Sequence, residues 1–133
     1  MKGSKIMKEC MTILDSEKKG YAPIWDYQEW RIAMILDTDD MHKENIKIMS
    51  KHMETDEVFV LLEGNANIYV GDGTDEFGKI TKYEMVPGKA FNVRAGTWHA
   101  TETLEGAKIF VVENRNTGDA NTIKLPVTPD MLP

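Results

Sequence analysis

The sequence predicts an all-β protein, a sandwich closed into a barrel, preceded by a short N-terminal helix. Two observations predict this class. Short apolar segments follow one another from Trp30 onward, several with the alternation that half-buried strands show. Turns that contain Gly or Pro, at 71–73, 87–88 and 95–96, separate these segments at regular spacing, which is typical of sandwiches and barrels. The 133 residues suffice for a single domain, 1–133.

The N-terminal segment has a different periodicity. Apolar residues recur at helical spacing from Ile6 to Leu14, with polar residues between them. A Gly at position 20 follows two lysines, as at the end of a helix. Residues 1–22 are therefore expected to form a short amphipathic helix within an arm, with a loosely docked arm as the alternative.

The barrel is expected to span residues 24–115. The predicted strands are 30–36, 45–52, 57–62, 66–70, 79–86, 91–93, 98–103 and 107–113. From residue 116 the chain is polar and contains Pro126, Pro129 and Pro133. Because proline interrupts helices, residues 116–133 are expected to form an extended C-terminal tail.

Charge and composition exclude several classes of function. The net charge is −6 and the isoelectric point is near 5.1, which disfavours nucleic acid and anionic membranes as partners. Cys10 is the only cysteine, so neither an internal disulfide nor a cysteine-based zinc site can form. No apolar run is long enough to span a membrane or to act as a secretion signal. A cytoplasmic protein is the expectation.

The segment SKHMETDEVFVLLEG contains the first candidate site residues. Ser50 and His52 share one face of the strand 45–52. The polar residues 53–56 can form a loop, which allows Glu57 to begin the next strand on the same interior face, beside Phe59. A carboxylate in apolar surroundings needs a partner, and a metal cation is one such partner.

The segment GKAFNVRAGTWH contains the second candidate. A tight turn at 95–96 places His99 at the start of a strand. If His99 points inward, Thr101 and Thr103 share its face.

These two segments resemble the two motifs of the cupin superfamily, G-x5-H-x-H-x3,4-E-x6-G and G-x5-P-x-G-x2-H-x3-N. The matching residues are His52, Glu57 and Gly64 in the first motif and Gly88, Gly96 and His99 in the second. The departures are Ser50 in place of the first histidine, Arg94 in place of the proline and Thr103 in place of the asparagine.

The resemblance implies a double-stranded β-helix of jelly-roll type that holds a divalent metal. Cupins bind iron, manganese, nickel or zinc through three histidines and a glutamate. Carried over, this implies His52, Glu57 and His99 as ligands of Mn, Fe, Ni or Zn, with one ligand missing at Ser50. Two imidazoles and a carboxylate still fit the facial triads of non-haem metal sites. A vestigial pocket, in which the histidines hydrogen-bond Glu57, is the alternative.

Other residues are candidates for the pocket or its surroundings: Ser50, Phe59, Tyr83, Arg94, Trp98 and Thr101. A guanidinium at a pocket mouth, such as that of Arg94, can hold a carboxylate or phosphate. His42 lies in a polar segment and is expected to be solvated.

These observations favour a small metal-dependent cupin enzyme acting on a small polar metabolite, by isomerase, lyase or oxygenase chemistry. A non-enzymatic ligand-binding or accessory cupin is the alternative. A metal-free enzyme is a third possibility, because the residues 96–100 also resemble the ureidoglycolate lyase branch of cupin-like proteins. A homodimer is expected because the strand 58–62 is apolar on both faces, although the N-terminal arm could cover its outer face.

Overall fold

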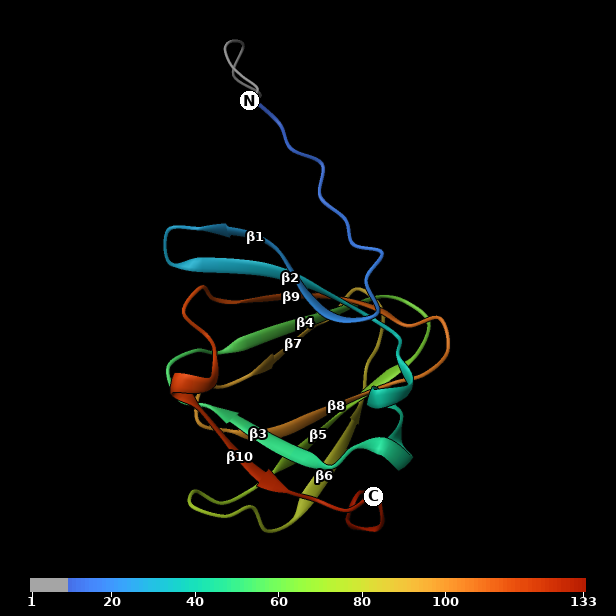
Figure 1. Cartoon of the computed structure of the whole chain (residues 1–133). Coiled ribbons are helices and arrows are strands. Elements are labelled where there is room, and N and C mark those ends of the chain that lie inside the picture. Colours follow the sequence, from blue (N-terminus) through green and yellow to red (C-terminus); the bar gives the residue numbers. More distant parts are fainter. Residues whose placement is uncertain (1–9) are drawn as a thin grey trace.

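The computed structural model describes residues 10–133, which form two antiparallel five-stranded sheets that lie face to face (Figure 1). The strand order is β1-β2-β9-β4-β7 in the first sheet and β10-β3-β8-β5-β6 in the second. The strands are β1 (Gly20–Tyr27), β2 (Trp30–Leu36), β3 (Ile48–His52), β4 (Glu57–Glu63), β5 (Ala66–Gly71), β6 (Ile80–Glu84), β7 (Ala90–Val93), β8 (Trp98–Thr103), β9 (Lys108–Asn114) and β10 (Thr122–Pro126). The helical elements of the described residues are single 3-10 turns, at Asp39–Met41, Lys43–Asn45, Asp119–Asn121 and Pro129–Met131. The predicted all-β class is confirmed.

The predicted N-terminal helix is not confirmed. Residues 10–17 contain no regular element, and the rest of the predicted helix lies outside the described residues. Met11 is 78% exposed and Ile13 is 92% exposed. A short amphipathic helix depends on packing of its apolar face, and Met11 and Ile13 pack little against the described residues.

Strand β1 was not predicted and begins inside the segment assigned to the N-terminal arm. It pairs antiparallel with β2, and its register shifts between Pro23 and Trp25. Its aromatic residues favour a strand, but Pro23 in the middle of the segment hid the pattern. The shift is tolerated because β1 lies at the edge of the first sheet.

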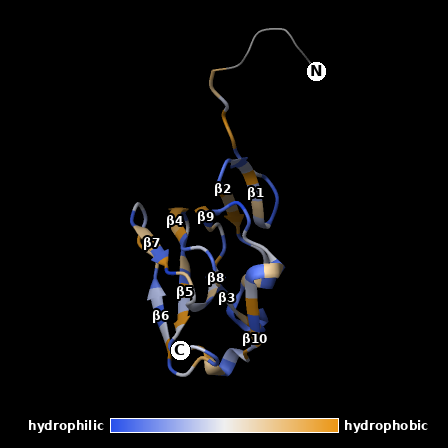
Figure 2. Cartoon of the chain, turned by 90° about the vertical axis from the view of Figure 1, so that its left-hand side faces the viewer, coloured by the Kyte–Doolittle hydropathy of each residue, from blue (hydrophilic) through white to orange (hydrophobic). Residues whose placement is uncertain are grey.

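The main core fills the space between the two sheets. It consists of the inward-facing apolar side chains of both sheets, among them Phe59 and Leu61 of β4, Ile68 of β5, and Ile109 and Val111 of β9. Figure 2 shows the hydrophobic residues concentrated in strands of both sheets. Alternation along these strands therefore sets which side chains face the interior.

A second core covers the outer face of the second sheet. Met49, Tyr69 and Trp98 point outward there and are fully buried. The C-terminal segment closes over them, since β10 pairs with β3 and Val127 and Leu132 pack into this cluster. The predicted extended tail thus contains a strand that continues the second sheet.

No helix in residues 10–133 is long and apolar enough to cross a membrane.

Candidate metal centre

His52, Glu57 and His99 meet between the two sheets. One potential ligand atom from each lies within 4.8 Å of the others. Oε1 of Glu57 is 3.2 Å from Nε2 of His52 and 3.2 Å from Nε2 of His99. Glu57 and His99 are buried, and the side chain of His52 is 18% exposed.

The fold brings these residues together from both sheets. His52 ends β3 in the second sheet, and Glu57 begins β4 in the first, so the loop 53–56 crosses between the sheets. His99 lies in β8, where it is the cross-strand partner of Ser50. Directly opposed residues of antiparallel strands point to the same face. Ser50 therefore shares the interior face with His99 and, by alternation, with His52.

The hydrogen bonds at the other ring nitrogens orient both imidazoles. Nδ1 of His99 lies 3.0 Å from the carbonyl oxygen of Thr97. Because a carbonyl can only accept, this nitrogen carries the proton, and in a neutral ring Nε2 is then an unprotonated acceptor. Nδ1 of His52 lies 2.8 Å from the hydroxyl of Thr122. Both Nε2 atoms are thus directed at Glu57, as in metal-binding histidines whose second nitrogen is held by the protein.

The electrostatics of the site favour a charged carboxylate. Burial would raise the pKa of Glu57, but the imidazole nitrogens of His52 and His99 that face it lower this pKa to about 2 when they carry protons. The hydrogen bond to Glu57 correspondingly raises the pKa of His52. Glu57 is therefore an anionic oxygen donor at neutral pH.

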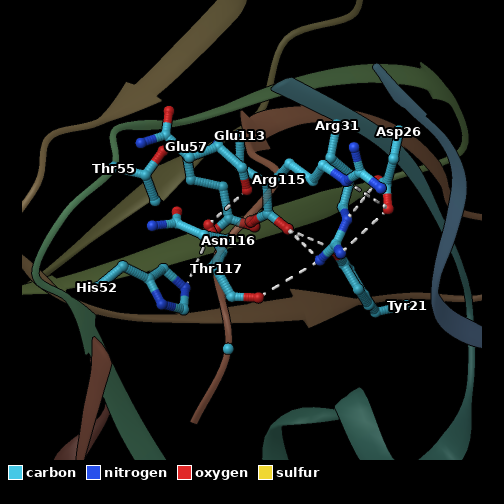
Figure 3. Close-up of polar contacts among 12 residues, drawn as sticks. Tyr21, Asp26, Arg31, His52, Thr55, Glu57, Glu113, Arg115, Asn116 and Thr117 are labelled. Atoms are coloured by element: carbon cyan, nitrogen blue, oxygen red, sulfur yellow. Dashed lines mark hydrogen bonds and ion pairs between the residues drawn. The ribbon is translucent and has the colours of Figure 1, made fainter. Parts of the chain in front are cut away.

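A second buried carboxyl group, that of Glu113, lies beside Glu57 (Figure 3). Glu113 is in β9, the strand that pairs with β4. The hydroxyl of Tyr21 donates a hydrogen bond to its Oε2, and a guanidinium nitrogen of Arg31 lies 3.8 Å from the same oxygen. Burial and the charge of Glu57 raise the pKa of Glu113 to about 7. The interior thus holds two carboxyl groups, two imidazoles and one guanidinium.

The sequence interpretation missed this second set. For Glu113 a signal was present, because it follows Val111 by two positions and so shares the inward face of its strand. Arg31 also had a signal, because it shares a face of the predicted strand 30–36 with Ala33 and Ile35. Tyr21 had no comparable signal, since β1 was not predicted.

The other predicted pocket residues lie in different places. Phe59 packs against His99 with ring centroids 6.2 Å apart. Tyr83 and Arg94 line a cavity of about 320 Å³, whereas Ser50 and Thr101 line a separate cavity of about 410 Å³.

Trp98 and His42 differ from expectation. Trp98 points to the outer face of the second sheet, where its indole nitrogen donates to the carbonyl oxygen of Thr74. Trp98 immediately precedes His99 in β8, so alternation along the strand directs the two side chains to opposite faces of the sheet. His42 is not simply solvated, because its Nε2 is 2.8 Å from Oδ1 of Asp37.

Comparison with known proteins gives matches only at the level of structure. No family model matches the chain, and no curated protein matches it significantly. A cupin-2 domain protein from Shewanella frigidimarina matches with 19% identity and a TM-score of 0.52, covering 74% of this chain and 84% of that one. KdgF from Halomonas sp. matches with 12% identity and a TM-score of 0.55, covering 82% and 91%. The QdtA 3,4-ketoisomerase from Thermoanaerobacterium thermosaccharolyticum matches with 20% identity and a TM-score of 0.52, covering 70% and 64%.

The fold of this chain is the cupin fold. The strand order of the two sheets agrees with the resemblance seen in the sequence motifs, and so do these structural neighbours. At these identities the likeness establishes architecture and leaves the activity to be argued from the site.

Proposed function

We propose that this protein is a metal-dependent cupin enzyme that acts on a small polar metabolite. His52, Glu57 and His99 hold one divalent metal, of the group Mn, Fe, Ni and Zn. Structural neighbours that are enzymes by name, such as the QdtA 3,4-ketoisomerase, support an enzymatic role. The donor set suits isomerase, lyase and oxygenase chemistry alike.

One observation carries the metal assignment. Nε2 of His99, an acceptor in the neutral ring, faces Oε1 of Glu57, which is also an acceptor, at 3.2 Å. Two acceptors in contact repel each other unless a proton or a cation lies between them. His52 directs a second imidazole nitrogen at the same oxygen. A divalent cation accepts electron pairs from all three donors, whereas a single proton is shared by only two atoms.

The chemistry of the donor set fits such an ion. Two imidazoles and one carboxylate form the ligand set that is typical of non-haem iron and related sites. A metal held by only three protein groups keeps open positions, and it supplies a Lewis acid that polarises a substrate oxygen. Ser50 adds no strong ligand on the shared face. Its hydroxyl is placed to hydrogen-bond a bound water or a substrate group.

The competing assignment is a metal-free pocket, as in a ligand-binding cupin or a ureidoglycolate lyase-like enzyme. It is favoured by the same distances, since 3.2 Å is also a hydrogen-bond separation for a protonated His52 and Glu57. Activity separates the two assignments. Protein without a His-tag is stripped with chelator, reloaded separately with each metal, and assayed on a panel of small keto acids and keto sugars. Turnover that requires one metal supports the proposal, and turnover that is equal in stripped and reloaded protein contradicts it.

We also propose that two copies pair through the outer face of the first sheet. Val58 and Val60 of β4 point away from the core and remain partly exposed in the single chain. Sedimentation at micromolar concentration should give the mass of a dimer, and a monomer would contradict this pairing.

A further inference from the structure

A cavity of about 320 Å³ opens where both sheets end. Strand β7 is the last strand of the first sheet and β6 is the last of the second (Figure 2). The cavity is lined by apolar and aromatic side chains of these strands and of β5: Ile68, Val70, Tyr83, Phe91 and Val93. This volume lies at the lower end of the range for small-molecule sites, roughly 300–1,000 Å³.

Strand pairing places the wall of the cavity close to the candidate metal centre, although none of the three proposed ligands lines the cavity itself. Val93 is the cross-strand partner of Glu57, and Val70 is the partner of His99. Opposed residues point to the same face and lie about 5 Å apart at Cβ. The inner wall of the cavity is therefore one strand removed from two of the three proposed ligands.

The polar lining residues all come from one segment, and only Arg94 among them is charged. The Arg94 side chain makes no hydrogen bond to any of residues 10–133 and no ion pair with them within 4.0 Å. Arg31 and Arg115, in contrast, both form ion pairs with Asp26. The cavity lining contains no acidic residue. A guanidinium whose N–H groups have no hydrogen-bond or ion-pair partner among the described residues, beside an apolar cavity, is complementary to a ligand with one negative charge.

The turn that carries Arg94 is held in place from both sides. Asp56 accepts hydrogen bonds from the Asn92 side chain at 3.1 Å and from the backbone N–H of Ala95 at 2.8 Å. The backbone N–H of Gly96 donates to the carbonyl oxygen of His52 at 2.7 Å. The charge of Arg94 contributes to lowering the pKa of Asp56, but the hydrogen bonds of Asp56 go to the backbone and to Asn92, so the guanidinium N–H groups remain available. A site on such a fixed turn loses little entropy on binding.

We propose that this cavity binds a small organic carboxylate, with its apolar part against Val70 and Phe91 and its carboxylate on Arg94. A carboxylate is favoured over a phosphate because the cavity supplies one cationic side chain and neither a lysine nor a helix N-terminus. The proposal names the substrate class of the proposed enzyme and rests on that function for its catalytic meaning, but binding itself requires no metal.

The test uses metal-stripped protein, so that failure of the metal site and failure of the carboxylate site are distinguishable. Phenylacetate, benzoate and hexanoate are titrated, with phenylacetamide as the neutral isostere of phenylacetate and inorganic phosphate as the competing anion. The readouts are calorimetry and amide chemical shifts of residues 92–97. We expect saturable binding of at least one carboxylate, about tenfold tighter than its amide, because a charge-assisted hydrogen bond is lost in the amide.

Variants assign the effect to the guanidinium. Arg94→Gln should weaken carboxylate binding about tenfold and remove the preference over the amide, and Arg94→Lys should retain part of it. Arg115→Gln is the matched control, since it removes an arginine elsewhere on the surface and should leave binding unchanged. The proposal is overturned if no carboxylate of the panel binds, if acid and amide bind equally, if Arg94→Gln binds like the natural protein, or if phosphate binds more tightly than every carboxylate.

Discussion

Replacing Ser50 by histidine should supply the metal ligand that the first motif lacks. Ser50 is the cross-strand partner of His99 and lies on the same interior face. The Cβ atoms of such a pair are about 5 Å apart. Ser50 also lines a cavity of about 410 Å³, which gives an imidazole the space it needs. The substitution therefore directs a third imidazole toward the metal position proposed among His52, Glu57 and His99.

The expected gain follows from ligand energetics. Loss of a group that merely orients a ligand lowers metal affinity by about 10- to 100-fold, and an added imidazole ligand should raise it by at least as much. This corresponds to about 1.4–2.8 kcal/mol. With metal in excess, the same free energy appears as added stability of the folded state. For a chain of this length the melting temperature of the loaded protein should rise by about 5–10 °C.

The assay compares Ser50→His, Ser50→Ala and the natural protein by metal calorimetry and by melting with and without metal. Ser50→Ala should bind metal like the natural protein, because a serine hydroxyl is a poor ligand. Lys47→His is the matched control, since it adds an imidazole at an exposed position on the same segment. Equal affinities of Ser50→His and the natural protein would refute the reasoning, because residue 50 would then not face the ion.

Three further changes test other parts of the structure. Tyr21→Phe should lower the free energy of unfolding by about 1–3 kcal/mol in urea denaturation, because buried Glu113 loses a donor. His42→Gln should lower the melting temperature at pH 6, and this effect should shrink as the pH rises. The hydrogen bond with Asp37 raises the pKa of His42 above 6.5, so its contribution is complete below pH 6.5 and disappears as the pH rises through the folded-state value. Gly64→Ala should lower the free energy of unfolding by more than about 2 kcal/mol. Gly64 has a φ of +73°, and an added Cβ would lie 2.7 Å from the backbone of residues 106 and 107.

Each of these changes has a control or an outcome that contradicts it. Tyr27→Phe, at an exposed tyrosine, should leave stability unchanged, and an equal loss in both tyrosine variants would remove the assigned role of Tyr21. If the loss of melting temperature in His42→Gln grows as the pH rises, protonated His42 does not stabilise the fold through Asp37. Gly96→Ala shares the positive φ, +77°, but meets open space. If Gly96→Ala costs as much as Gly64→Ala, the backbone contact at Gly64 is not the cause.

The strands of the interior were predictable because alternation is a local property. The segment from Phe59 to Leu61 shows inward apolar residues two positions apart, and the structure buries both side chains. The same rule placed His52 and Ser50 on one face. Motif spacing then linked His99, which is far along the chain, to the same site.

The parts that sequence reasoning missed depend on tertiary context. Strand β1 contains Pro23 and a register shift, so it lacks a clean alternating pattern, and its pairing with β2 decides its conformation. Tyr21 reaches Glu113 only because of that pairing. Trp98 is a candidate for the pocket or its surroundings by its chemical type, but alternation relative to His99 places it in the core on the outer face of the second sheet.

Calorimetric titration of Mn(II), Fe(II), Ni(II) and Zn(II) into chelator-stripped protein without a His-tag tests the central claim most directly. The account predicts one ion per chain for at least one of these metals. It also predicts at least about 100-fold weaker binding in Glu57→Gln and in His99→Gln, with His42→Gln as the matched control that binds like the natural protein. Absence of binding by all four metals, or equal binding in Glu57→Gln and the natural protein, would contradict it.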